Sequence, residues 1–187
     1  MNDLPITKLE AARRLIDVGI KLLFSDEDPL AIHTLAAGAF RVVRDLANKT
    51  SGHILNTRLK DVIAPGKERE FWKAFNTTYN FLKHAESDSE DTLDGFDGEA
   101  NDHILFIDCQ YYAGLGQSFT PEMNVLSAWY MAMYPEMIIT DSNSPLRQMH
   151  DLNKHLSRLT RKQQLQEGRK LLRFVRNNPS MYGNGKS

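Results

Sequence analysis

The sequence predicts an all-α protein, built as an irregular bundle of about six to eight helices. Apolar residues recur at spacings of three and four over long stretches, which is the period of an amphipathic helix. No run of residues alternates apolar and polar side chains as a strand would, and no repeat with a fixed period is found. The length of 187 residues and the hydrophobic content of 41% suit a single helical domain over residues 1–187.

The first two helices follow from spacing and capping signals. Residues 7–24 place apolar side chains on one face, and either Thr7 or Asp3 stands where it can cap the first turn. Asp28 is a suitable N-cap for the second helix, because Pro29 follows it at the first helical position. Residues 36–39 of the second helix are Ala-Ala-Gly-Ala, and such small side chains allow another helix to approach closely.

The remaining helices are marked in the same way. A helix at about residues 67–86 carries Trp72, Phe75, Tyr79 and Leu82 on its apolar face. An acidic loop rich in Ser, Asp, Glu and Gly follows over residues 87–101, and a helix resumes near Glu99. Capping signals then start three further helices, at Thr120-Pro121, at Ser144-Pro145 and at Thr160 with Gln163.

Composition limits the classes of function. The net charge of −1 gives no overall reason to expect nucleic acid or an anionic membrane as partner. The N-terminus has no secretory pattern, and the longest apolar cluster, near residues 128–139, is too short to span a bilayer. The single cysteine, Cys109, fits a reducing compartment. We therefore expect a cytoplasmic protein of bacterial style, with no membrane partner and no cofactor.

Charge is nevertheless segregated along the chain. Residues 86–102 hold eight acids and no Lys or Arg, whereas residues 147–176 hold nine bases against two acids. The basic C-terminal helices, at residues 145–176, therefore offer a surface that could contact nucleic-acid phosphates. The alternative is a solvated face, or one that docks the acidic loop of the same chain or of a second copy. The bases of the predicted surface are Arg158, Arg161, Lys162, Arg169, Lys170 and Arg173.

A polar stripe runs along the helix at residues 67–86. Asn76, Asn80 and His84 recur every four residues, and Lys83 lies beside them. An imidazole can act as acid or base near neutral pH, and a neighbouring ammonium can stabilise an anion. His84, Lys83 and Asn80 are therefore candidate catalytic residues, and Asn76 is a candidate ligand-binding residue. The alternative is the wet face of an amphipathic helix.

His33 and Arg44, both on the second helix, are further candidate ligand-binding residues. The alternatives are a partly buried histidine with a structural hydrogen bond and, for Arg44, an ion pair. If the two helices pack antiparallel, His33 can approach His84, and Asp88 would then complete a candidate metal site. The spacing of these three residues matches no established zinc motif.

Two parts of the sequence resemble an uncharacterised family of small bacterial helical proteins. They are Ala31-Ile-His-Thr-Leu-Ala-Ala-Gly-Ala39 with Arg44-Asp-Leu46, and Asn80-Phe-Leu-Lys-His-Ala85 with Asp88. The resemblance extends over residues 8–137 and implies no established activity. More distantly, the helical organisation is similar to HEPN-type domains, which include ribonucleases and non-catalytic binding modules. The nuclease members would imply an R-x(4–6)-H motif, which this chain lacks, since Arg147 and His150 stand too close together.

Three hypotheses of function follow. The leading one is a cytosolic binding or interaction module, expected to be a homodimer, in which the Asn80/Lys83/His84 face, with His33, is the site for a ligand or a partner. The alternative is a HEPN-like, metal-independent ribonuclease in which His84 acts as acid and base. The third is a metal-binding helical protein. The sequence leaves open whether the protein is an enzyme.

Overall fold

The computed structural model describes residues 5–51, 68–83, 89–134 and 155–178. Within these ranges the chain forms six α-helices and one short 3-10 helix and contains no strand, so the predicted all-α class is confirmed. The elements are α1 (Lys8–Ser25), α2 (Pro29–Ser51), α4 (Glu68–Lys83), α5 (Ala100–Gly114), α6 (Pro121–Met133), η2 (Leu156–Arg158) and α8 (Arg161–Asn177).

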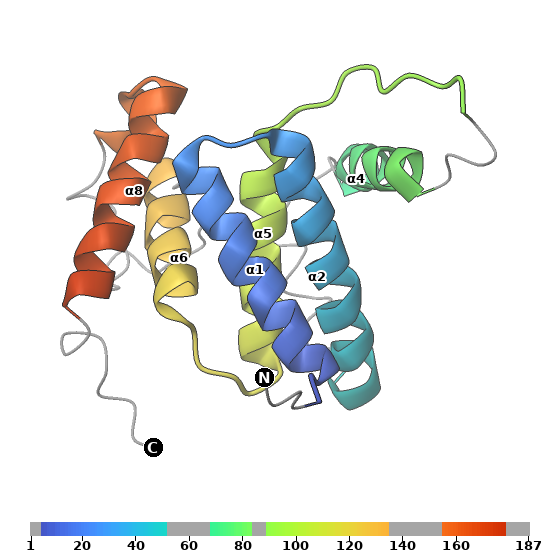
Figure 1. Ribbon diagram of the computed structural model, residues 1–187, viewed down its shortest axis with the longest axis horizontal. Coiled ribbons are helices and arrows are strands. Elements are labelled where there is room, and N and C mark those ends of the chain that lie inside the picture. The colour runs from blue at the N-terminus through green and yellow to red at the C-terminus, as the bar shows by residue number, and fades with distance from the viewer. Residues whose placement is uncertain (1–4, 52–67, 84–88, 135–154, 179–187) are drawn as a thin grey trace.

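The helices α1, α2 and α5 form a packed central group, with α5 behind α1 in Figure 1. The helices α6 and α8 extend this group on one side, and α4 packs against α2 on the other. Residues 89–99 run from the α4 side over the end of the bundle to the start of α5. The start of α2, the start of α5, α4 and this loop therefore meet at one end of the molecule.

Most of the predicted helix starts are confirmed. At each one a side-chain oxygen accepts a hydrogen bond from a backbone N–H group that the first turn leaves unpaired. Asp28, for example, accepts hydrogen bonds from the N–H groups of Leu30 at 2.8 Å and Ala31 at 3.1 Å. The confirmed caps are Thr7, Asp28, Thr120 and, as a complete capping box, Thr160 with Gln163. The start predicted at Ser144-Pro145 lies outside the described residues.

Small side chains hold α1, α2 and α5 close together, as the Ala-Ala-Gly-Ala segment predicts. Ala36, Ala37 and Ala39 of α2 are fully buried. On α1, a Cβ atom added to Gly19 would lie 3.0 Å from a methyl carbon of Leu105 on α5. The three helix backbones can approach because few side-chain atoms stand between them.

The contacts that fix the last helix, α8, to α1 and α6 include one close helix approach and two hydrogen bonds. The ring of Phe24 lies so close to Gly168 that a Cβ atom there would be 2.2 Å from it. The Arg169 Nε group donates a hydrogen bond of 2.7 Å to the Phe24 carbonyl at the end of α1. The indole N–H of Trp129 on α6 donates one of 2.9 Å to the Gln164 carbonyl.

A buried ion pair adds a further connection, between α8 and α5. Asp102 is fully buried and accepts two hydrogen bonds from Arg161, each of 2.7 Å. The Tyr134 hydroxyl donates a further hydrogen bond of 2.8 Å to the same carboxylate. Burial, together with this carboxylate, raises the pKa of Tyr134, so the phenol keeps its proton and remains a donor. The Asp102 carboxylate therefore accepts three hydrogen bonds from described residues, two from Arg161 and one from Tyr134.

Two details of the sequence prediction are wrong. Leu82 is 41% exposed rather than buried, because α4 packs mainly against α2 and its last turn extends away from the bundle. The acidic loop also ends earlier than residue 101, since Ala100 and Asn101 already belong to α5. None of the helices in the described ranges is long and apolar enough to cross a bilayer.

The contact between Gly168 and Phe24 gives a matched pair of glycine variants. Gly168→Ala should lower the free energy of unfolding by about 1–3 kcal/mol, because the new methyl group overlaps a buried ring. Gly38→Ala should raise it by about 0.5–1 kcal/mol, because alanine favours helix and the nearest atom, in Leu15, lies 3.6 Å away. Urea unfolding of both variants measures the two effects, and equal effects would contradict this packing.

Candidate ligand-binding site

The described members of the polar stripe face solvent. Asn76, Asn80 and Lys83 are exposed on α4. The Asn76 amide donates a hydrogen bond of 2.8 Å to the Trp72 carbonyl of its own helix, and the Lys83 Nζ atom lies 6.0 Å from the centre of the Tyr79 ring. The stripe is therefore an open helix face over its described part. His84 and Asp88, the other predicted members, lie outside the described residues.

His33 is instead buried at the end of the bundle where α2, α4 and α5 meet. Its residue is 2% exposed, and its Nδ1 atom lies 3.1 Å from Oδ1 of Asn101 on α5. The Asn101 Nδ2 group donates a hydrogen bond of 2.9 Å to the Pro29 carbonyl. The structural hydrogen bond considered for His33 is therefore present, and its partner is a residue 68 positions away.

This arrangement fixes the proton on the imidazole ring. The Pro29 carbonyl can only accept, so the Asn101 amide must turn its N–H₂ group toward Pro29 and its oxygen toward His33. An oxygen that faces Nδ1 requires that Nδ1 carry the proton. In the neutral ring, Nε2 therefore bears a lone pair and acts as a hydrogen-bond acceptor.

The Nε2 atom of His33 is buried and has no hydrogen-bond partner among the described residues. Burial lowers the pKa of His33, although the Asn101 amide and the Phe75 backbone both favour the protonated ring. The Phe75 backbone is thus near enough to act on the ring without making a hydrogen bond that satisfies Nε2. An unsatisfied buried polar atom costs about 1–3 kcal/mol, so this nitrogen requires an explanation.

His33 also lines a cavity of about 310 Å³. The walls of this cavity come from α2, α4, α5 and the loop at residues 89–99, which meet at this end of the bundle. The loop can lie close to α2 because Gly98 has no side chain. A Cβ atom added to Gly98 would lie 2.9 Å from the Cβ atom of Pro29. The other lining residues are Lys73, Phe75, Thr77 and Thr78 of α4, Leu93, Asp94, Gly95, Phe96 and Asp97 of the loop, and Ala100 and Ile104 of α5.

Two aromatic rings flank His33 inside this cavity, which we call the His33 pocket. The ring centres of Phe75 and Phe96 lie 5.6 Å and 5.8 Å from that of the imidazole. The pocket therefore combines aromatic walls with a few polar and charged side chains. That combination is typical of sites for small molecules.

The other predicted binding and metal residues do not join the His33 pocket. Arg44 does not line it and pairs with its neighbour Asp45 at 3.1 Å, which is the ion pair considered as its alternative. Within the described ranges, no group of three or more His, Cys, Asp or Glu side chains could hold a metal ion. The predicted metal site cannot be assembled from described residues, since His33 is its one member among them.

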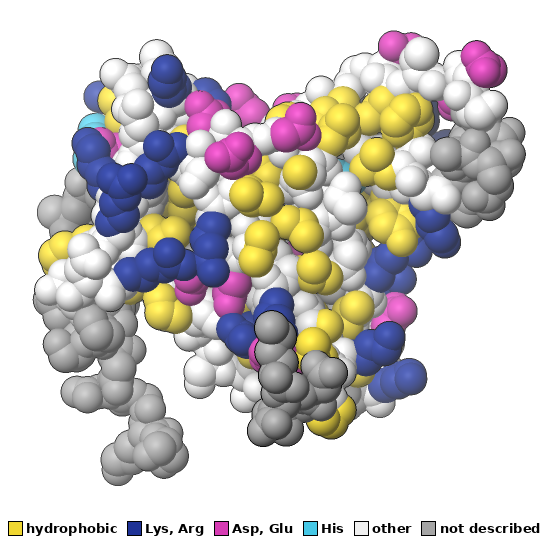
Figure 2. All heavy atoms as spheres, viewed as in Figure 1, with side chains coloured by type: hydrophobic (Ala, Val, Ile, Leu, Met, Phe, Trp, Pro, Cys, Tyr) yellow, Lys and Arg dark blue, Asp and Glu magenta, His cyan; other side chains and the backbone are white. Residues whose placement is uncertain are grey.

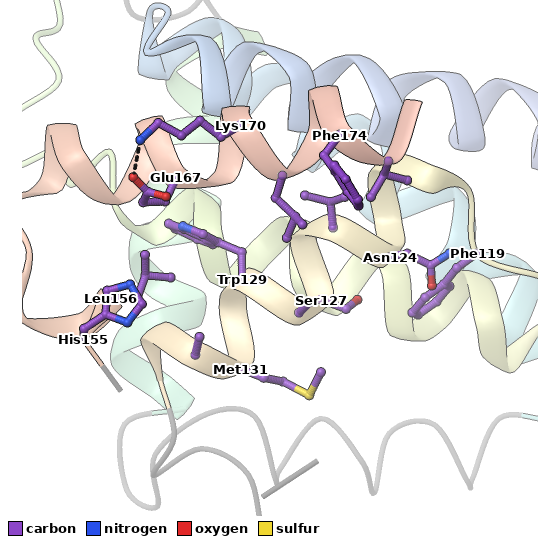
Figure 3. Close-up of a pocket in the computed structure, with 15 residues that line it drawn as sticks. Phe119, Asn124, Ser127, Trp129, Met131, His155, Leu156, Glu167, Lys170 and Phe174 are labelled. Carbon is purple, nitrogen blue, oxygen red and sulfur yellow. Dashed lines mark hydrogen bonds and ion pairs between the residues drawn. The ribbon is translucent and has the colours of Figure 1, made fainter. Parts of the chain in front are cut away.

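A larger cavity, of about 670 Å³, lies between α6 and α8 (Figure 3). Trp129, Met131 and Phe174 give it a mainly apolar lining. Its charged pair, Glu167 with Lys170, is already satisfied by an ion pair of 2.7 Å. No described residue shows what covers this groove. We therefore assign no function to this groove.

The predicted basic surface is partly used to hold the fold. Figure 2 shows Lys and Arg side chains gathered over α8. Three of the six predicted bases are engaged within the chain, namely Arg161 with Asp102, Arg169 with the Phe24 carbonyl and Lys170 with Glu167. The other three, Arg158, Lys162 and Arg173, are exposed, so nucleic-acid binding through this surface stays a prediction.

A second buried titratable group is Asp108, in the middle of α5. Its residue is fully buried, and neither carboxyl oxygen has a hydrogen-bond partner among the described residues. Burial raises the pKa of Asp108 well above its ordinary value, so the group keeps its proton. It lies seven residues after Asn101 on the same face of α5 and does not line the His33 pocket.

Comparison with protein-family models, with curated proteins and with solved structures finds no match to this chain. The inference of function therefore depends on the geometry of the His33 pocket.

Asn101→Asp tests the contact that orients His33. A carboxylate beside Nδ1 favours the imidazolium form, so the pKa of His33 should rise from its lowered value. Asn48→Asp is the control, because it adds the same charge to α2 about 22 Å along the helix axis. NMR titration of the His33 ring protons measures the pKa of His33 in both variants. An unchanged His33 pKa in Asn101→Asp would contradict the contact.

Asp108→Asn tests the buried carboxyl. Below the pKa that Asp108 has in the unfolded chain, Asp108 is protonated in both the folded and the unfolded protein. Above that pH, only the unfolded protein releases the proton, so the wild type loses stability as pH rises. The loss amounts to about 1.4 kcal/mol per pH unit until the folded pKa is reached. The difference in free energy of unfolding between variant and wild type should therefore grow from pH 4 to pH 7 in favour of the variant. A constant difference in urea unfolding would mean that Asp108 is ionised in the folded protein.

Proposed function

We propose that the protein is a helical binding module whose ligand site is the His33 pocket. The observation that supports this proposal is His33, a buried residue that lines the cavity and whose Nε2 atom has no hydrogen-bond partner among the described residues. Native proteins pair nearly all such atoms, so an unpaired one in a residue that lines a cavity is suited to a bound molecule or water. The ligand it suits carries an N–H or O–H group, because the nitrogen offers a lone pair.

Binding is favoured over catalysis for this pocket. General acid–base chemistry needs a second group within hydrogen-bond reach of the imidazole, or a nucleophile that the imidazole can activate. Among the described residues nothing makes a hydrogen bond to Nε2. The one close polar contact of the ring, through Nδ1, is with the Asn101 amide, which orients the imidazole but transfers no proton.

The other hypotheses from the sequence stay predictions. The ribonuclease hypothesis depends on His84, which lies outside the described residues, and no described contact favours it. The distant HEPN relationship, a homodimer, a bacterial origin and a cytoplasmic location are likewise proposals that no described contact tests.

A matched pair of neutral ligands tests the proposed function. Phenylacetamide carries N–H donors, whereas N,N-dimethylphenylacetamide has the same phenyl and carbonyl groups and no N–H donor. Phenylacetamide should shift the amide NMR signals of Gly95 and Phe96, and the dimethyl compound should not, because only the first can donate to Nε2. Equal binding of both, or binding of neither, would count against the proposal.

Two variants of α4 locate the binding. Thr77 is exposed and lines the His33 pocket, whereas its neighbour Asn76 is exposed and does not line it. Thr77→Phe should block the binding of phenylacetamide, and Asn76→Phe should leave it unchanged. Loss of binding in Asn76→Phe alone would place the site on the polar stripe instead. Both substitutions are at exposed positions, so both variants should fold.

A further inference from the structure

We infer that the His33 pocket selects an organic cation, a protonated amine that carries an apolar group, over a neutral or anionic ligand of the same size. This inference rests on the proposed function, because it concerns the chemical class of ligand in the same site. It depends on three independent features: the acceptor atom, the charge of the loop and the aromatic lining.

The acceptor atom excludes one class of ligand by itself. The nine-tenths-buried His33 presents a lone pair at Nε2, since its proton is held on Nδ1 by Asn101. A carboxylate or phosphate oxygen also carries lone pairs and would be repelled there. An ammonium group carries up to three N–H donors and can direct one of them to Nε2.

The loop that forms one wall of the pocket is acidic. Residues 89–99 hold five acids and no Lys or Arg. Two of these acids, Asp94 and Asp97, line the pocket itself. Asp97 also accepts a hydrogen bond of 2.9 Å from the Glu99 N–H group at the start of α5, whereas Asp94 makes no hydrogen bond or ion pair with any described residue. Asp94 is therefore free to pair with a bound cation.

Lys73 lines the pocket from α4, and its positive charge offsets part of the negative charge of Asp94 and Asp97. The lining thus holds two carboxylates against one ammonium, and the remaining acids of the loop lie nearby in the sequence. Phe75 and Phe96 add aromatic rings, which attract cations through their electron-rich faces. A monatomic metal ion fits less well, since the described residues contain no group of ligands that could hold one.

Three ligands of similar size test the inference. Phenethylamine, phenylacetamide and phenylacetate are respectively cationic, neutral and anionic near neutral pH. Affinities from NMR titration should fall in that order, and added salt should weaken the binding of phenethylamine more than that of phenylacetamide. Equal affinity for the amine and the amide would overturn the inference and leave the proposed function in place, whereas tightest binding of phenylacetate, which has no N–H or O–H donor near neutral pH, would overturn both. Binding of none of the three would overturn both.

Charge variants at exposed positions complete the test. Asp94→Asn should weaken the binding of phenethylamine roughly three- to fivefold, and Lys73→Gln should strengthen it by a similar factor. Asp91→Asn is the matched control, because it removes the same charge three residues earlier at an exposed position that does not line the pocket. None of the three variants should change the affinity for phenylacetamide more than twofold. Equal weakening by Asp91→Asn and Asp94→Asn would mean that the charge of the loop acts as a whole and that Asp94 is not a contact of the ligand.

Discussion

Two adjacent side chains at the start of α5 connect this helix to α2 and to α8. Asn101 and Asp102 are both fully buried. Neighbouring residues of a helix point about 100° apart, so the two side chains reach different partners. Asn101 bonds to the Pro29 carbonyl and to His33 on α2, and Asp102 holds Arg161 at the start of α8. One turn of α5 thereby joins helices that lie on opposite sides of it.

The candidate site is a consequence of the same connection. The Asn101 amide has one N–H₂ group and one oxygen, and the Pro29 carbonyl determines which of them faces His33. The imidazole must then place its proton on Nδ1 and its lone pair on Nε2. Burial keeps the ring neutral by lowering the pKa of His33. A contact that stabilises the fold thus leaves the acceptor atom Nε2 without a hydrogen-bond partner among the described residues.

Local features of the fold could be predicted from the sequence, because they depend on neighbouring residues. The N-caps at Asp28 and Thr120 and the capping box at Thr160 each require only three or four consecutive positions. The small residues at 36–39 likewise predict the close approach of α2 to its neighbours. These features depend on capping and on side-chain volume, and the structure confirms them.

The site itself could be predicted only in part. The sequence makes His33 a candidate, but no pattern in it connects His33 with Asn101, which lies 68 positions away. The spacing of Asn76, Asn80 and Lys83 correctly places them on one face of a helix. Spacing alone does not show whether that face lines a cavity, and the described residues of the stripe are exposed to solvent. Arg161, predicted as a surface base, instead pairs with a fully buried carboxylate. Each of these differences concerns a contact between distant parts of the chain.

The protonation of the His33 ring is the central claim, and long-range ¹H–¹⁵N NMR measures it directly. Near neutral pH the account predicts a neutral ring with the proton on Nδ1 and an unprotonated Nε2. A proton on Nε2, or a doubly protonated ring, would contradict the account, because the pocket would then offer a donor where the account requires an acceptor.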